Sequence, residues 1–360
     1  MKRLITYWFL LAGLLTACED IYNPDIDQVD SVIVADARLV YGQSNNAIHL
    51  YNSLGFNEKV ESYPPVYGAK VTIYDNRGGE YNLTESKSGY YPVNFRLNPD
   101  LDYKLMISYG GNIYESSFEP VPKVPVLDSV YGIPEIKLII EGGENDVNDI
   151  REKPGLQLYT DITSEEEMPY YRFTARKIMQ YTYTINVPFF GSILPVIVYC
   201  WNSFYPQGIF NIASPPDYSN TREINKHPLF FIEERGFVGP DQSFAGWILI
   251  LYQHGLSKSG HGYYKDLNSQ LGYEGRLFDP LYVQARSNLK CINNPDQLIL
   301  GNFEISTIKE TRYFIQYISE ERGYHLKPIP YFYNIPVNGE QEEDQPGFWE
   351  YPHKNYPDEQ

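Results

Sequence analysis

The sequence predicts a mainly β protein made of two β-rich domains with one short helix. Short segments alternate apolar and polar residues with a period of two, and glycine, proline or asparagine residues separate them. Tyrosine, which favours strands, accounts for 34 of the 360 residues. A connector containing Pro120, Pro122 and Pro125 divides the chain, because proline lacks a backbone donor and pairs poorly within a sheet.

The first residues have the features of an export signal. A basic start, Met1-Lys2-Arg3, precedes an apolar run at residues 4–15, and Leu15-Thr16-Ala17-Cys18 follows as a lipobox. The apolar run is shorter than the roughly 20 residues that span a bilayer. We therefore expect a lipoprotein signal peptide at 1–17 and a lipidated tether at 18–30, with Cys18 acylated and held in a lipid bilayer. An uncleaved anchor helix, or a plain signal peptide with a chance cysteine, is the alternative.

Residues 31–122 are predicted to form the first domain. Alternating segments at 31–40, 47–51 and 68–75 indicate strands, and a hairpin around Gly110-Gly111 joins 103–109 to 112–118. Short strands at this spacing are typical of a sandwich, so we expect an immunoglobulin-like or transthyretin-like β-sandwich.

Residues 126–336 are predicted to form a second, larger β-rich domain. Its one helix would have its body at 263–271, with Ser257 or Ser259 as the cap and Gly272 at its end. The continuous apolar runs 194–201 and 244–252 indicate buried strands, and 298–305 with 311–318 indicates a closing strand pair. The acidic, proline-containing residues 337–360 are expected to be a flexible tail.

Charge and cysteine content limit the function classes. A net charge of −17 disfavours nucleic acid and a direct grip on anionic headgroups. Cys18 is consumed by lipid, which leaves Cys200 and Cys291. An exported context favours a disulfide between them. The bond would close a loop of about 90 residues and stabilise the fold by about 4 kcal/mol. Two free buried thiols are the alternative.

The sequence contains no recognisable catalytic or metal-binding motif, so we expect no enzyme activity, cofactor or metal. The six histidines form no HExxH or HxH pattern, and His254-Gly255-Leu256-Ser257 lacks the GxSxG context of a hydrolase. The acidic loop 141–149 could offer oxygen ligands to calcium but lacks EF-hand spacing. Loop aromatics of the second domain are the candidate binding residues: Tyr205, Tyr218, Tyr263, Tyr264 and Tyr273.

Several short motifs occur in a characteristic order. After the lipobox come Gly68-Ala69-Lys70-Val71-Thr72-Ile73, Pro120-Val121-Pro122, Tyr170-Tyr171-Arg172-Phe173, Gly275-Arg276-Leu277-Phe278-Asp279-Pro280 and Gly301-Asn302-Phe303-Glu304-Ile305-Ser306. Together they resemble the outer-membrane lipoproteins of the Bacteroidota grouped as domain of unknown function 4249, over nearly the whole mature chain. The chain departs from that pattern after Pro280, where Leu281 to Asn288 replace a further proline and a glycine-asparagine pair.

The resemblance implies a lipid-anchored outer-membrane location, facing the cell exterior, beside a TonB-dependent receptor. Glu19 and Asp20 partly match the surface-export signal of such lipoproteins, and Asp-Ser-Val triplets suggest O-glycosylation at Ser31 and Ser129. The expected function is therefore a non-catalytic accessory or ligand-capturing subunit, whose small-molecule, glycan or peptide ligand the sequence does not identify. A structural or adhesive surface module, or an enzyme acting on glycans or peptides, is the alternative.

Overall fold

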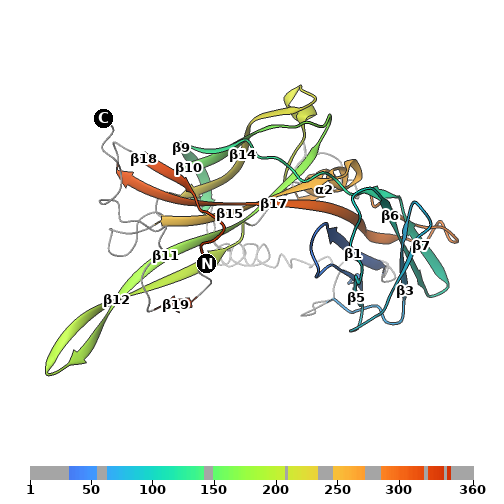
Figure 1. Cartoon of the computed structure of the whole chain (residues 1–360), viewed down its shortest axis with the longest axis horizontal. Coiled ribbons are helices and arrows are strands. Elements are labelled where there is room, and N and C mark those ends of the chain that lie inside the picture. The colour runs from blue at the N-terminus through green and yellow to red at the C-terminus, as the bar shows by residue number, and fades with distance from the viewer. Residues whose placement is uncertain are drawn as a thin grey trace, which may run out of the picture.

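The computed structural model describes residues 32–54, 63–141, 149–206, 210–233, 246–271, 285–319, 323–335 and 339–341. Within these ranges the chain is mainly β with one α-helix, as the sequence predicts. Two lobes lie at opposite ends of an elongated molecule, and one long strand runs between them (Figure 1). None of the described helices has the length and apolar character needed to cross a membrane.

The N-terminal lobe is a sandwich of two sheets around one core. One sheet has the order β16-β7-β6-β3-β4 with β8 beside β6, and the other contains β1, β2 and β5 with the first part of β17 (Ile299–Ser319). Alternating residues such as Ala37 and Leu39 face Ile73 and Leu105 across the core. The strands are β1 (Ile33–Val40), β2 (Ala47–Asn52), β3 (Lys70–Asp75), β4 (Glu80–Leu83), β5 (Tyr90–Pro92), β6 (Asp102–Tyr109), β7 (Asn112–Ser116), β8 (Glu119–Pro120) and β16 (Leu289–Cys291).

Strand β17 (Ile299–Ser319) joins the two lobes. Its first part pairs in parallel with β1, from Ile299 to Ser306, and its second part pairs antiparallel with β15 (Gly246–Leu256). The predicted strand pair 298–305 and 311–318 is therefore wrong. No glycine, proline or asparagine interrupts residues 303–319, so the alternation continues through both segments as one strand. The predicted domain ranges stay a prediction, although β16 and the first part of β17 pack into the N-terminal core.

The second lobe is built around β15 (Gly246–Leu256), which is buried almost throughout. One face packs on the three-stranded sheet β14-β10-β9, and the other carries Ile248 and Ile250 against Trp201 and Phe314. This confirms the buried strand expected at 244–252 over the residues that the structure describes. The remaining strands are β9 (Ser129–Glu141), β10 (Asp149–Thr163), β11 (Tyr170–Phe189), β12 (Ser192–Phe204), β13 (Asn211–Ala213), β14 (Glu223–Glu233), β18 (Gly323–Pro328) and β19 (Gly339–Gln341).

The predicted helix is confirmed as α2 (Lys258–Leu271). Ser257 caps it, since its hydroxyl accepts the Gly260 N–H at 3.1 Å. The same hydroxyl donates to the buried carboxylate of Glu119 at 2.6 Å, and Ser259 donates to that carboxylate at 2.7 Å. Glu119 also accepts bonds from Ser117 and Asn288, so it ties the helix start to β8 and to the segment before β16.

Gly301 explains part of the motif at 301–306. Its backbone has φ +94, and a Cβ there would lie 2.0 Å from the Ala35 carbonyl oxygen on β1. Only glycine fits this position, where β17 begins to pair with β1 across the N-terminal lobe.

Two expectations are corrected. The predicted Cys200–Cys291 disulfide does not form: Cys200 lies in β12 of the second lobe, whereas Cys291 lies in β16 of the N-terminal lobe opposite Tyr114. The run 194–201 is not buried throughout, because Leu194 and Val196 are exposed where β12 extends beyond the sheet with β11 as its partner. Three residues of the expected tail form β19, which pairs with β12.

Candidate functional site

A polar pocket of about 300 Å³ lies where the N-terminal lobe meets β11, β15 and β17. This volume is at the lower end of the range for small-molecule sites. Its wall contains two arginines, two carboxylates and two histidines, with few apolar side chains. The residues that line it are Asp36, Arg38, Val40, Gln43, Asn45, Asn46, Ala47, His49, Tyr90, Arg172, His254, Glu304 and Ser306.

Strand alternation places the charged side chains on one side of β1 and β17. Asp36 and Arg38 alternate with the core residues of β1, and Glu304 pairs with Arg38 in the parallel register. A polar alternating face is normally exposed. Here Asn302, Glu304 and Ser306 are buried, because α2 and the second lobe cover this side of β17 (Figure 1).

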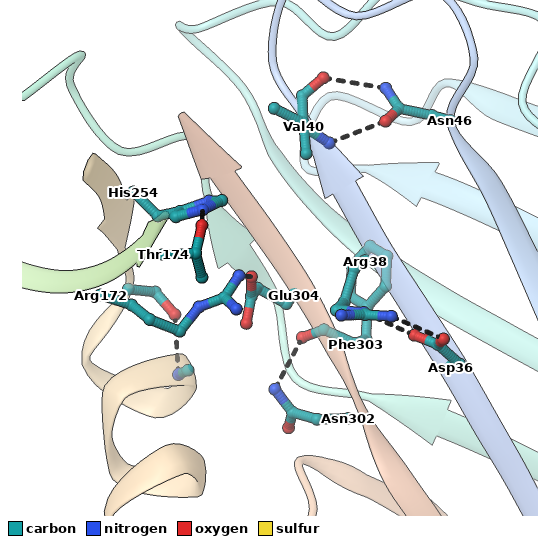
Figure 2. Close-up of polar contacts among 12 residues, drawn as sticks. Asp36, Arg38, Val40, Asn46, Arg172, Thr174, His254, Asn302, Phe303 and Glu304 are labelled. Atoms are coloured by element: carbon teal, nitrogen blue, oxygen red, sulfur yellow. Dashed lines mark hydrogen bonds and ion pairs between the residues drawn. The ribbon is translucent and has the colours of Figure 1, made fainter. Parts of the chain in front are cut away.

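Asp36 and Arg38 form the outer pair of the site. The Arg38 Nε and Nη2 atoms donate to the two Asp36 carboxylate oxygens at 2.7 and 2.8 Å, in a fork geometry (Figure 2). This hydrogen bonding raises the pKa of Arg38 above its usual value. Next to this pair, the Asn46 amide bonds both the N–H and the carbonyl of Val40, which braces the end of β1 at the pocket rim.

Arg172 and Glu304 form an inner pair with poor geometry. Arg172 is 8% exposed and Glu304 is 2% exposed, but the Arg172 Nη2 atom is 3.9 Å from the Glu304 Oε1 atom, too far for a hydrogen bond. The Arg172 guanidinium lies over the Tyr264 ring of α2, 4.6 Å from its centre. Burial, followed by the Glu304 charge, raises the pKa of Tyr264, so its hydroxyl stays protonated.

His254 is directly opposite Arg172 on the neighbouring strand β15. Its Nε2 atom is 3.1 Å from the Thr174 hydroxyl (Figure 2). Burial, together with the positive charges of Arg172 and Arg38, lowers the pKa of His254 to about 3. The imidazole is therefore neutral at physiological pH.

Three of the residues around the pocket each have a buried polar atom without a hydrogen-bond partner. These atoms are Arg172 Nε, His254 Nδ1 and Glu304 Oε1. A buried unsatisfied polar group costs about 1–3 kcal/mol, more when it is charged. Because three such atoms belong to residues that line one polar cavity, the cavity suits a polar occupant, although buried atoms without a partner also occur elsewhere, at Trp201 Nε1 and Trp247 Nε1.

The structure brings one of the predicted binding tyrosines, Tyr264, into contact with this site, and Tyr263 lies beside it on α2. Tyr218 lies elsewhere, with its hydroxyl 2.6 Å from the His227 Nδ1 atom. Tyr205 is exposed on the wall of a second cavity of about 580 Å³, which shares Arg172 with the polar pocket. Tyr273, Cys18 and Ser31 lie outside the described residues, and Ser129 begins β9.

Sequence reasoning missed the charged residues of the pocket. Arg172 and Glu304 both belong to the ordered motifs, at Tyr170-Tyr171-Arg172-Phe173 and Gly301-Asn302-Phe303-Glu304. A charged residue inside an apolar strand motif was the signal that could have found them.

The His254–Ser257 segment, in contrast, forms no catalytic pair: His254 bonds Thr174, and Ser257 bonds Glu119. The acidic loop considered for calcium lies mostly outside the described residues. In the part of the chain that the structure describes, no cluster of His, Cys, Asp and Glu could hold a metal ion.

Comparison with known families decides the relationship of this chain. The family described as domain of unknown function (DUF4249) matches residues 19–312. The chain belongs to this DUF4249 family. The match includes every residue of the polar pocket. No curated protein and no solved structure matches the chain.

Proposed function

We propose that this DUF4249 protein is a non-catalytic capture lipoprotein, anchored through Cys18 at the outer membrane and facing the cell exterior. It binds a small polar ligand in the pocket between its lobes and acts beside a TonB-dependent receptor. The observation that carries the proposal is the set of three unsatisfied buried atoms at the pocket, on Arg172, His254 and Glu304. Unsatisfied buried polar atoms lower the stability of the fold, and ligand binding is the simplest reason for a protein to retain them.

The chemistry of the pocket defines the ligand class. Arg172 Nε is a donor, and Glu304 Oε1 is an acceptor. The ligand therefore offers an acceptor and a donor a few ångströms apart, as a monosaccharide or an amino acid does. Neutral His254 supplies one further donor or acceptor, according to its tautomer. The small volume favours a single sugar, an amino acid or a dipeptide over a long polymer.

A thermal-shift panel of monosaccharides, amino acids and dipeptides tests the binding proposal. A ligand at a hundred times its Kd stabilises the folded state by about 2.7 kcal/mol, which is a measurable shift. We expect at least one class to stabilise the wild type and not the Arg172→Met/Glu304→Gln variant. Arg222→Met is the matched control, because Arg222 forms an exposed pair with Glu167 away from the pocket. Equal thermal shifts in the wild type and the pocket variant would show that the ligand does not bind in this pocket.

The partner is tested separately by gentle detergent pulldown from the native outer membrane. A stoichiometric TonB-dependent receptor supports the capture subunit. Self-association or a host-matrix protein in its place supports the adhesive module instead.

A further inference from the structure

Beyond the end of the main sheet, β11 and β12 continue as a two-stranded hairpin arm, residues 183–198 (Figure 1). Its two-residue turn is Phe190-Gly191, between the paired residues Phe189 and Ser192. Both turn residues have positive φ, +44 for Phe190 and +81 for Gly191, as in a type I′ turn. The first position of such a turn favours asparagine, yet this chain places a phenylalanine there that is 94% exposed.

Apolar side chains predominate on both faces of the arm near its tip. Residues that are opposite in an antiparallel pair point to the same face, so the strand register divides the side chains near the tip into two sets. One set contains Ile185, Val187, Phe189, Leu194 and Val196, all exposed, with Ser192 as its polar member. The other contains Pro188, Ile193 and Pro195 with the polar residues Thr184 and Asn186, and no residue of either set is charged.

Charge is also excluded from this part of the chain. Residues 178–216 contain no aspartate, glutamate, lysine, arginine or histidine, although charged residues make up 21% of the whole sequence. The surrounding protein has a net charge of −17. An exposed arm without any charge is suited to an apolar environment rather than to water.

The backbone of the tip also suits an apolar environment. In a two-residue hairpin the pairs alternate, so Pro188 opposite Ile193 and Pro195 opposite Asn186 are non-hydrogen-bonded pairs, whose N–H groups point outward. Proline has no N–H, so each of these pairs lacks one outward donor. This disfavours an added strand along the edge of the tip. It also lowers the number of donors left unsatisfied in hydrocarbon, but Asn186 and Ile193 keep outward N–H groups, so the insertion has to be shallow enough for these groups to reach the headgroups.

We infer that the tip of the hairpin arm, residues 185–196, inserts into the hydrocarbon of a phospholipid bilayer. A protein groove would cover one face of the ribbon, whereas a bilayer surrounds both faces and the exposed Phe190. Four residue steps from Ile185 to Phe189 extend about 13 Å, so a shallow insertion places the exposed Phe190 in hydrocarbon while Ile185 and Val196 lie near the headgroups. The arm would act beside the lipid on Cys18 as a second attachment, and it does not depend on what the pocket binds.

Vesicle binding tests this inference. The mature chain from residue 18, carrying Cys18→Ser so that no acyl group assists, is mixed with neutral phosphatidylcholine vesicles and sedimented. We expect binding that does not weaken with salt. Phe190→Asn should reduce the partition coefficient roughly tenfold through the loss of one buried aromatic side chain. The same change should leave thermal stability unchanged or raised, because asparagine is preferred in this turn.

Phe332→Asn is the matched control, since Phe332 is 79% exposed but lies outside the arm. It should bind vesicles as the wild type does. A fluorophore on Phe190→Cys should also be quenched by lipids labelled in their acyl chains. No vesicle binding, equal losses in the two asparagine variants, or crosslinking of the tip to a protein in native membranes would overturn the inference. The ligand panel is unaffected by these outcomes, so the two proposals fail separately.

Discussion

The buried pair Arg172–Glu304 should lower the free energy of unfolding rather than raise it. At 3.9 Å the Coulomb attraction is about 4 kcal/mol with an effective dielectric constant of 20. Removing two charges from water costs several kcal/mol for each ion, and these two form no hydrogen bond with each other. Replacing both by neutral groups of similar shape, Arg172→Met with Glu304→Gln, should therefore change the free energy of unfolding by less than about 1 kcal/mol, or raise it.

Each single substitution should behave differently, because it leaves one buried charge without its partner. We expect Glu304→Gln and Arg172→Met each to lower the free energy of unfolding by about 3 kcal/mol. Met retains the apolar stem that packs over Tyr264. Urea unfolding of the wild type and the three variants closes a double-mutant cycle. A double variant that loses the sum of the two single effects would show that the two side chains stabilise the fold independently of each other, and would refute the argument that the pair is retained for binding.

Three further predictions concern stability. His227 accepts a proton near pH 4 when folded but near 6.5 when unfolded, because burial lowers its pKa. The unfolded state therefore binds more protons, and His227 alone should lower the free energy of unfolding by about 3 kcal/mol between pH 6.5 and 4. In urea titrations His227→Gln should lack this contribution and keep the one from His254, whose pKa burial also lowers. Glu119→Ala leaves four hydrogen-bond donors without their acceptor and should lower the free energy of unfolding by about 3 kcal/mol. Glu119→Gln should lower it less by the same measurement. Gly301→Ala should lower the unfolding free energy by about 3 kcal/mol, since its Cβ would meet the Ala35 carbonyl, and an unchanged denaturation midpoint would refute this.

Local patterns predict the local elements of this fold well. Alternation locates β3 and β6, and the Ser257 cap with its following polar segment locates α2. These features depend on neighbours in sequence, namely strand alternation and helix capping. The mainly β class follows from the same signals.

Long-range pairing is what the sequence does not reveal. The alternation in β17 has the same period whether the segment is one strand or two, so its role in joining the lobes is invisible without the partners β1 and β15. The sequence does not predict the burial of the Glu304 face for the same reason. Alternation predicts that this side faces solvent, whereas α2 covers it. The Cys200–Cys291 disulfide was predicted from compartment and count alone, which do not specify which strands are neighbours.

The most direct test of the capture function is native mass spectrometry of the lipoprotein extracted in mild detergent from its own membrane. The Arg172→Met/Glu304→Gln variant is prepared in parallel, and both are equilibrated with the polar extract of the native medium. We expect a bound small polar molecule on the wild type whose mass is missing from the variant. Identical spectra for the two proteins, with or without an added mass, would contradict it.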